Sequence, residues 1–231
     1  MMEALPIIIF VVFGGLIITG AVFSWLGAKR RREEMVALAN RLGWTYRAGN
    51  DRSLPTRYAG LKFLERGSNR YAYNVLSGNY QDRAACGFDY HYETYSTNSK
   101  GKRTTHHHHC SVVVLETGLP LKPLTIRPEG FFDRVGEFFG FDDIDFESTE
   151  FSRAFHVWSP DRAWAFDVIH QETMEYLLGA PRFSIELLGP RVFVYRAACF
   201  SAAEYQSALE LSSGVIDRLP KYLLREWKGA V

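Results

Sequence analysis

The residues from Leu5 to Leu26 contain no charged side chain and are mostly Ile, Val, Phe and Leu. At about 1.5 Å per residue they would form a helix roughly 33 Å long, close to the thickness of the bilayer hydrocarbon. The run also lacks the polar stripe that marks a helix on the surface of a soluble protein. We therefore expect a transmembrane helix over residues 5–27.

The basic residues next to this run predict its orientation. Trp25 lies near the end of the apolar run, where an interfacial aromatic residue belongs, and the run is followed by Lys29, Arg30, Arg31 and Arg32. A secretory signal peptide would place its basic residues before the apolar run. Under the positive-inside rule we expect a single-pass protein of the cell membrane, with its N-terminus outside and its C-terminal part in the cytoplasm. The four basic residues form the predicted membrane flank, where they can also attract anionic lipid.

After this flank the residue pattern predicts an α+β fold. A juxtamembrane basic segment and helix over residues 28–42 should lead into a cytoplasmic domain over residues 43–231. Alternation of side chains between residues 61 and 116 predicts an antiparallel strand meander with a turn at Ser77-Gly78-Asn79. Ser201 followed by Glu204 predicts a capping box at the start of a long C-terminal helix over residues 202–219. We also expect a helix over 130–139, paired strands at 155–158 and 163–168, a hairpin around Gly189-Pro190, and a seam near 117–123.

The meander carries a pattern that resembles a family of small membrane-anchored bacterial proteins, a domain of unknown function. The pattern consists of Gly67, Asn74-Val75 with Gly78, Phe88-Asp89-Tyr90-x-Tyr92 and a threonine before the Val-rich strand. A second block of such families is similar to this chain's segment Phe151-x-x-x-Phe155-x-Val157-x-Ser159-x-Asp161. The resemblance covers the chain from about residue 42 to 178. It implies the anchored topology and the fold class, and it implies no activity.

Four consecutive histidines, His106 to His109, precede Cys110 on the returning strand of the meander. Alternate residues of a strand share a face, so paired imidazoles can chelate zinc or another transition metal. The partner strand carries His91 and Glu93, but a slip of one residue would put Tyr90 and Tyr92 beside the histidines instead. We take His106, His108, His91 and Glu93 as the candidate metal ligands, against the alternative of an exposed polar strand.

The rest of the sequence argues against several classes of function. A net charge of +1 gives no global attraction to nucleic acid. We find no P-loop, G-x-G-x-x-G or G-x-S-x-G motif, and therefore lean against an enzyme. Three widely spaced cysteines are not a disulfide framework.

Three functions remain as hypotheses. The first is an interaction or scaffold module on the inner face of the membrane, with the membrane and another membrane-associated protein as partners. The second is an anionic lipid headgroup binder, similar by fold analogy to pleckstrin-homology-like domains. Its lipid-facing residues would be Lys100, Lys102 and Arg103 at a polar hairpin tip, with Arg66 and Arg70 in a basic turn. The third is a metal-binding or metal-sensing domain that uses the histidine strand.

Overall fold

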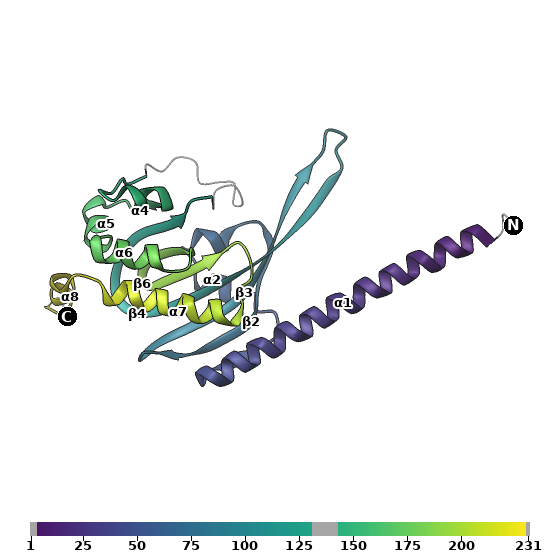
Figure 1. Ribbon diagram of the computed structural model, residues 1–231, viewed down its shortest axis with the longest axis horizontal. Helices are drawn as coiled ribbons and strands as arrows, with labels where there is room; N and C mark the ends of the chain where they lie inside the picture. The colour runs from purple at the N-terminus through teal and green to yellow at the C-terminus, as the bar shows by residue number, and fades with distance from the viewer. Residues whose placement is uncertain (1–3, 131–142, 230–231) are drawn as a thin grey trace.

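A single antiparallel sheet organises the domain in the computed structural model, which describes residues 4–130 and 143–229 (Figure 1). Within these residues the sheet has six strands in the order β1-β2-β3-β4-β5, and β6 pairs with β4. The strands are β1 (Thr45–Arg47), β2 (Ser68–Tyr80), β3 (Arg83–Thr97), β4 (Arg103–Pro128), β5 (Phe155–Trp158) and β6 (Ser184–Arg196). The expected α+β class and the antiparallel meander, here β2-β3-β4, are therefore confirmed.

Helices cover both faces of this sheet. They are α1 (Ala4–Leu42), α2 (Leu54–Arg57), the 3₁₀ helix η1 (Lys62–Glu65), α4 (Thr149–Ala154), α5 (Arg162–Val168), α6 (Gln171–Gly179), α7 (Ala202–Asp217) and α8 (Lys221–Gly229). Helix α7 begins with the expected capping box, in which the Ser201 side chain accepts from the backbone of Glu204 and the Glu204 side chain accepts from the backbone of Ser201.

The long strand β4 is the spine of the sheet. Its first half pairs with β3 from Arg103 to Leu115, and its other edge pairs with β6 from Ser111 to Ile126. Near its end, Thr125 pairs with both Trp158 of β5 and Glu186 of β6. Strand β4 is continuous through residues 117–123, the region of the expected seam, and its pairing with β6 shifts register there between Glu116 and Leu121 and again between Leu121 and Leu124.

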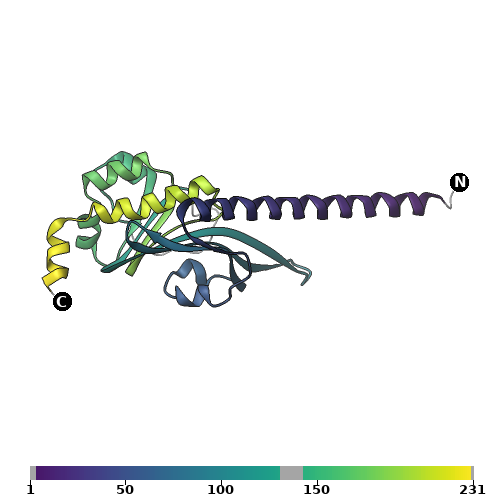
Figure 2. The same ribbon diagram turned by 90° about the horizontal axis from the view of Figure 1, so that it is seen from below.

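Two hydrophobic cores lie on opposite faces of the sheet. One face is covered by the C-terminal end of α1 together with α5, α6 and α7, and its core includes Met35, Val113 and Tyr205. The other face is covered by α2 and η1, with Phe63 and Tyr90 in its core. Figure 2 shows α1 and α7 on one side of the sheet and the α2 segment on the other.

Helix α1 contacts the domain only near its C-terminal end and projects away from the domain toward the N-terminus (Figures 1 and 2). Met35, Leu38 and Ala39 are buried against the domain, and Gly43 (φ +67°) ends the helix in the left-handed conformation expected of a C-terminal cap. Nearer the N-terminus, Ile18 and Phe23 are exposed. The described residues include no helix with the length and apolar character needed to cross a membrane.

Several local expectations are wrong, each for a physical reason. Residues 163–168 form helix α5 and not a strand, because the Asp161 side chain caps the backbone N–H of Trp164. Residues 184–196 form one strand and not a hairpin, because Gly189 (φ +56°) accommodates an irregularity in pairing with β4. The turn of the β2–β3 hairpin lies at Gln81 and Asp82, both at positive φ, and β2 continues through Gly78. The expected helix over 130–139 falls almost wholly outside the described residues.

Gly78 lies directly under the Trp44 ring, whose Nε1 donates a hydrogen bond of 2.9 Å to the carbonyl oxygen of Asn79. A Cβ atom at residue 78 would stand far inside van der Waals distance of that ring. We expect Gly78→Ala to lower the free energy of unfolding by about 1–3 kcal/mol, as forced overpacking does. Urea denaturation of the full chain in detergent measures the change.

Gly179→Ala is the matched control, since nothing lies within 4 Å of a Cβ at that position in α6. Alanine in a helix should stabilise it by up to about 1 kcal/mol. Equal effects of the two substitutions would contradict the assigned Trp44–Gly78 packing.

Candidate functional site

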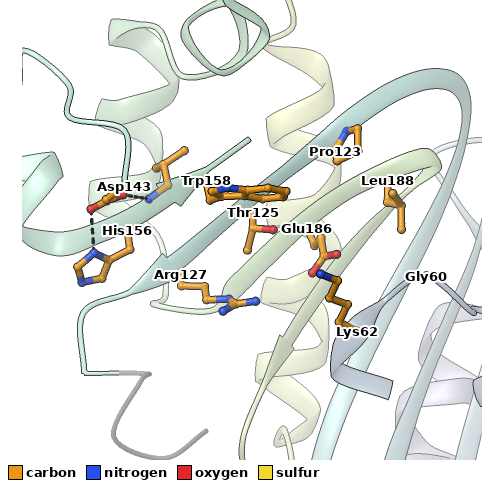
Figure 3. A pocket seen from close by; sticks show the side chains of 11 residues that line it. Gly60, Lys62, Pro123, Thr125, Arg127, Asp143, His156, Trp158, Glu186 and Leu188 are labelled. Atoms are coloured by element: carbon orange, nitrogen blue, oxygen red, sulfur yellow. Dashed lines mark hydrogen bonds and ion pairs between the residues drawn. The ribbon is translucent and has the colours of Figure 1, made fainter. Parts of the chain in front are cut away.

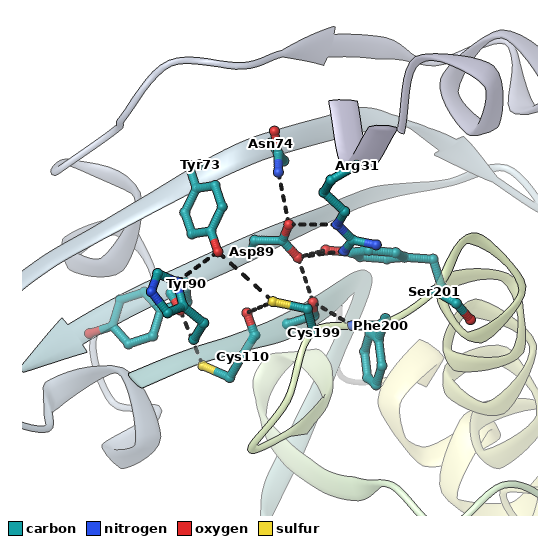
Figure 4. Close-up of polar contacts among 12 residues, drawn as sticks. Arg31, Tyr73, Asn74, Asp89, Tyr90, Cys110, Cys199, Phe200 and Ser201 are labelled. Atoms are coloured by element: carbon teal, nitrogen blue, oxygen red, sulfur yellow. Dashed lines mark hydrogen bonds and ion pairs between the residues drawn. The ribbon is translucent and has the colours of Figure 1, made fainter. Parts of the chain in front are cut away.

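A buried carboxylate, Asp89, joins α1 to the sheet (Figure 4). It lies on β3 with 1% of its surface exposed. Its oxygens accept hydrogen bonds from Arg31 (Nη2 at 2.8 Å and Nε at 3.1 Å), Asn74 (2.9 Å), Ser111 (2.6 Å) and Tyr205 (3.0 Å). These donors come from α1, β2, β4 and α7, so one side chain ties together four elements and its own strand.

Arg31, which the sequence placed in the membrane flank, is engaged by this carboxylate. Its side chain is 19% exposed and points into the domain, where it forms a two-pronged ion pair with Asp89. Burial by itself would lower the pKa of Arg31, but the hydrogen bonds and charge of Asp89 raise it above its ordinary value. The residue remains charged, and its charge is compensated within the protein.

The other predicted flank residues lie on exposed parts of α1. Lys29 pairs with Glu33 at 3.9 Å and Arg30 with Glu34 at 3.2 Å, each one helical turn away. Trp25 is 61% exposed, and the Lys29 Nζ lies 5.6 Å from its ring centroid. These groups are accessible to a partner, which distinguishes them from Arg31.

The register of β3 and β4 decides which histidines meet the acidic partner strand. His91 pairs with His109 and Glu93 with His107, whereas His108 lies opposite Tyr92 and His106 opposite Thr94. His106 and His108 accordingly project from the other face of the ribbon. Their ring nitrogens contact Ser96 at 2.8 Å and Thr94 at 2.7 Å. The predicted ligand set of His106, His108, His91 and Glu93 is therefore not brought together.

A different group does come together. His91, Glu93 and His107 bring one ring nitrogen or carboxylate oxygen each to within 4.8 Å of one another. The hydrogen bond from Asn69 is the main reason that the pKa of Glu93 lies below its ordinary value. Next to the group, burial and then the neighbouring His91 and His107 lower the pKa of His109. This face of the ribbon thus holds the Glu93 carboxylate near His109, an imidazole whose neutral form is favoured.

The basic residues predicted to face lipid lie at the tip of the β3–β4 hairpin. Lys100, Lys102 and Arg103 are exposed there. The Asn98 side chain shapes the tip by accepting from the backbone N–H groups of Lys100 (3.0 Å) and Lys102 (2.9 Å). Arg103 stacks over Tyr95, with 3.4 Å from its Cζ to the ring centroid. Arg66 and Arg70 lie instead beside η1, where Arg66 contacts the Phe63 ring and Arg70 donates to the Glu65 carbonyl oxygen.

A cavity with a volume of about 280 Å³, which we call the Glu186 cavity, lies between η1 and the ends of β4, β5 and β6 (Figure 3). Its lining is mixed: Trp158, Leu188 and Pro123 are apolar, and Lys62, Arg127 and Glu186 are ionisable. Burial raises the pKa of Glu186 to about 7. The volume is near the lower end of small-ligand sites, so the cavity is suited to a small molecule.

The rim of the Glu186 cavity carries a histidine held between two carboxylates. His156 Nδ1 lies 2.8 Å from Asp143 Oδ2, and its Nε2 lies 2.6 Å from Glu129 Oε2. Asp143 also accepts a hydrogen bond of 2.7 Å from the backbone of Val157. These contacts fasten residue 143 to β5, so Asp143 has a structural role there.

Sequence reasoning missed the roles of Asp89, Asn69 and His107. Asp89 and Asn74 belong to the motif that carried the family resemblance, so a charged residue inside an aromatic strand was the available signal for Asp89. His107 is one of four consecutive histidines, and the register of β3 and β4 is what places it opposite Glu93. Asn69 gave no signal, since its position depends on a β-bulge between Ser68 and Tyr71.

Replacing Arg31 tests the link between α1 and the sheet. We expect Arg31→Ala to lower the free energy of unfolding by about 3 kcal/mol or more, because it leaves the buried Asp89 charge without its counterion. Arg30→Ala removes the neighbouring exposed pair and should cost less than about 1 kcal/mol. Chemical denaturation of both variants in detergent provides the comparison, and similar losses would contradict a buried Arg31–Asp89 pair.

Glu186 should make stability depend on pH. The unfolded chain releases this proton near pH 4.5, whereas the folded state keeps it until about pH 7. Stability contributed by the protonated group is therefore present at low pH and is lost as pH rises from 4.5 through about 7. We expect Glu186→Gln to match the wild type at pH 4 and to exceed it at pH 8, by up to about 3 kcal/mol. If urea denaturation gave the variant and the wild type equal free energies of unfolding at pH 8 as well as at pH 4, the raised pKa of Glu186 would be ruled out.

No family model and no curated protein matches the sequence, so the family resemblance seen in the sequence stays a prediction. Among solved structures, the chain is similar to the crystal structure of the mycobacterial trehalose monomycolate transport factor A, TtfA. The similarity has a TM-score of 0.59 at 15% sequence identity, and it covers 84% of this chain and 97% of the TtfA chain. At this level of identity, the chain shares its fold with TtfA.

Proposed function

We propose that this protein is a membrane-tethered binding module on the cytoplasmic face of the cell membrane, with its basic hairpin turned toward anionic lipid. The observation that carries the proposal is the projecting half of α1. Its sequence from Leu5 to Leu26 has no charged side chain, and apolar residues such as Ile18 (67% exposed) and Phe23 (71% exposed) have no partner among the described residues. Large exposed apolar side chains of this kind are typical of a site that is covered by lipid or by a partner protein.

The arrangement of α1 and the β3–β4 hairpin supports a lipid-facing tip. Both elements project from the same end of the domain in the two views, while α8 lies at the opposite end (Figures 1 and 2). A membrane that held the apolar half of α1 would therefore be approached by the hairpin, whose tip exposes Lys100, Lys102 and Arg103. Each basic residue near an anionic surface contributes about 1 kcal/mol of attraction. Lys29 and Arg30 on α1 would add to the same positive zone.

The buried Arg31–Asp89 pair gives this tether a defined orientation. Arg31 lies only a few residues beyond the apolar run, and the contacts of Met35 and Leu38 continue the docking toward the end of the helix. A flexible linker would let the domain tumble at the membrane. A helix docked by a buried ion pair instead presents one end of the domain to the bilayer, which suits a module that must position a partner or a lipid headgroup.

The tether itself is tested by extraction of the full chain from cell membranes. We expect the protein to sediment with membranes and to resist alkaline carbonate, because residues 5–26 would be held in the hydrocarbon. A Cys placed at Glu3 should react with an impermeant thiol reagent added outside intact cells, and one at Lys221 should not. Release by carbonate would contradict the tether, and the reverse labelling pattern would contradict the orientation.

The lipid-facing tip is tested in vesicles that contain the reconstituted full chain. A fluorophore on Ser99→Cys should be quenched by a quencher attached to lipid headgroups, and a fluorophore on Lys221→Cys should not be quenched. We expect Ser99 quenching to fall at least about twofold when anionic lipid is omitted or when Lys100, Lys102 and Arg103 are changed to Gln, since the attraction is electrostatic. If Ser99 quenching stayed the same after both changes, the lipid contact of the tip would be refuted, and the proposed tether would be unaffected.

A further inference from the structure

The face of the β3–β4 ribbon that carries Asp89 also carries three potential metal ligands further along the strands. The Nε2 atom of His91 lies 3.2 Å from the Nδ1 atom of His107, and that Nδ1 atom lies 3.4 Å from Oε1 of Glu93. Two imidazoles and one carboxylate converge on one point, from two strands whose cross-strand register holds them on the same face.

These separations match those within a zinc coordination shell. Ligand atoms placed about 2.0–2.1 Å from zinc in a tetrahedron lie roughly 3.3–3.4 Å from each other. The two short distances in the group are close to that value, and the remaining pair lies within 4.8 Å. An ion would therefore be accepted with small side-chain movements. Two imidazoles and a carboxylate are also a donor set that zinc uses elsewhere.

The surroundings of the group orient the ligands. His91 is 3% exposed, and its Nδ1 atom lies 3.1 Å from the carbonyl oxygen of Asn69. Because a carbonyl oxygen only accepts, Nδ1 carries the hydrogen in the neutral ring, and Nε2 presents its lone pair to His107 and Glu93. The Asn69 side chain and the Tyr95 hydroxyl donate to Glu93 at 2.7 Å and 3.1 Å. Metal-binding histidines and carboxylates in proteins are held by outer contacts of this type.

The position of Asn69 itself depends on a local irregularity of β2. The strand bulges between Ser68 and Tyr71, and Asn69 takes the left-handed conformation (φ +47°). Arg52 donates to the Asn69 side-chain oxygen at 3.1 Å, and this orients the Asn69 side chain so that its Nδ2 atom donates to Glu93. Bulges often re-aim a residue next to a functional site. Here the bulge directs one residue at two of the three ligands.

We propose that His91, Glu93 and His107 bind a zinc ion through Nε2, a carboxylate oxygen and Nδ1. His107 is 57% exposed, so the fourth coordination position is open to water or to a ligand from outside. His109 lies beside the group, but its Nδ1 is engaged by the Tyr73 hydroxyl at 2.9 Å. Bound zinc would fasten β3 to β4 below the hairpin tip. The site does not depend on the membrane tether, because all three ligands come from the hairpin.

The test is a zinc titration of the full chain, purified without a histidine tag in detergent, in competition with a fluorescent zinc chelator. We expect one zinc ion per chain. His107→Ala and Glu93→Gln should each weaken binding at least tenfold, since each removes one of three ligands. His106→Ala and His108→Ala are matched controls in the same histidine run and should change the affinity less than twofold. Cobalt in place of zinc should give the visible bands of a tetrahedral site, and these should be lost in His107→Ala.

Two outcomes would overturn the site. Absence of stoichiometric zinc binding would refute it outright. Equal weakening by His106→Ala and His107→Ala would mean that the run binds metal adventitiously from both faces. Glu93→Gln separates loss of a ligand from loss of fold because it keeps the side-chain shape. A Glu93→Gln chain with wild-type circular dichroism and unchanged zinc affinity would also exclude the proposed carboxylate ligand.

Discussion

The arrangement of the whole molecule depends on one buried carboxylate. Asp89 accepts hydrogen bonds from side chains of α1, β2, β4 and α7, and the Ser111 hydroxyl that donates to it also accepts from the backbone of Phe200 at 2.8 Å. A buried charge is tolerated only when its partners are complete. The aromatic cores on either face supply most of the burial, but this network specifies where α1 and α7 lie over the sheet.

The polar residues of the strands continue outward from this point in a single row. On β3 the side chains of Asp89, His91 and Glu93 share one face, and Ser111, His109 and His107 lie opposite them on β4. The row begins fully buried beneath α1 and becomes exposed toward the hairpin tip. Burial decreases along this one pair of strands, from the ion pair of Asp89 near the core to the more accessible group of His91, Glu93 and His107 further out.

Sequence reasoning succeeded where local chemistry decides the structure, and it failed where a contact distant in sequence decides it. The α+β class, the meander and the Ser201 capping box follow from periodicity and from short-range hydrogen bonds. The role of Arg31 does not, because its partner Asp89 is 58 residues away and the flanking basic residues are genuinely exposed. The candidate metal group was half found: His91 and Glu93 were named, while the register selects His107 over its neighbours.

The uninterrupted course of α1 means that the apolar run and the docked segment share one helical phase. Each residue of an α-helix turns the chain by about 100° and advances it by about 1.5 Å. The number of residues between the apolar run and Arg31 therefore sets the rotation of the domain about the axis of α1, relative to the apolar run. One residue added or lost in this short stretch would turn the domain by more than a quarter of a revolution while moving it scarcely at all along that axis.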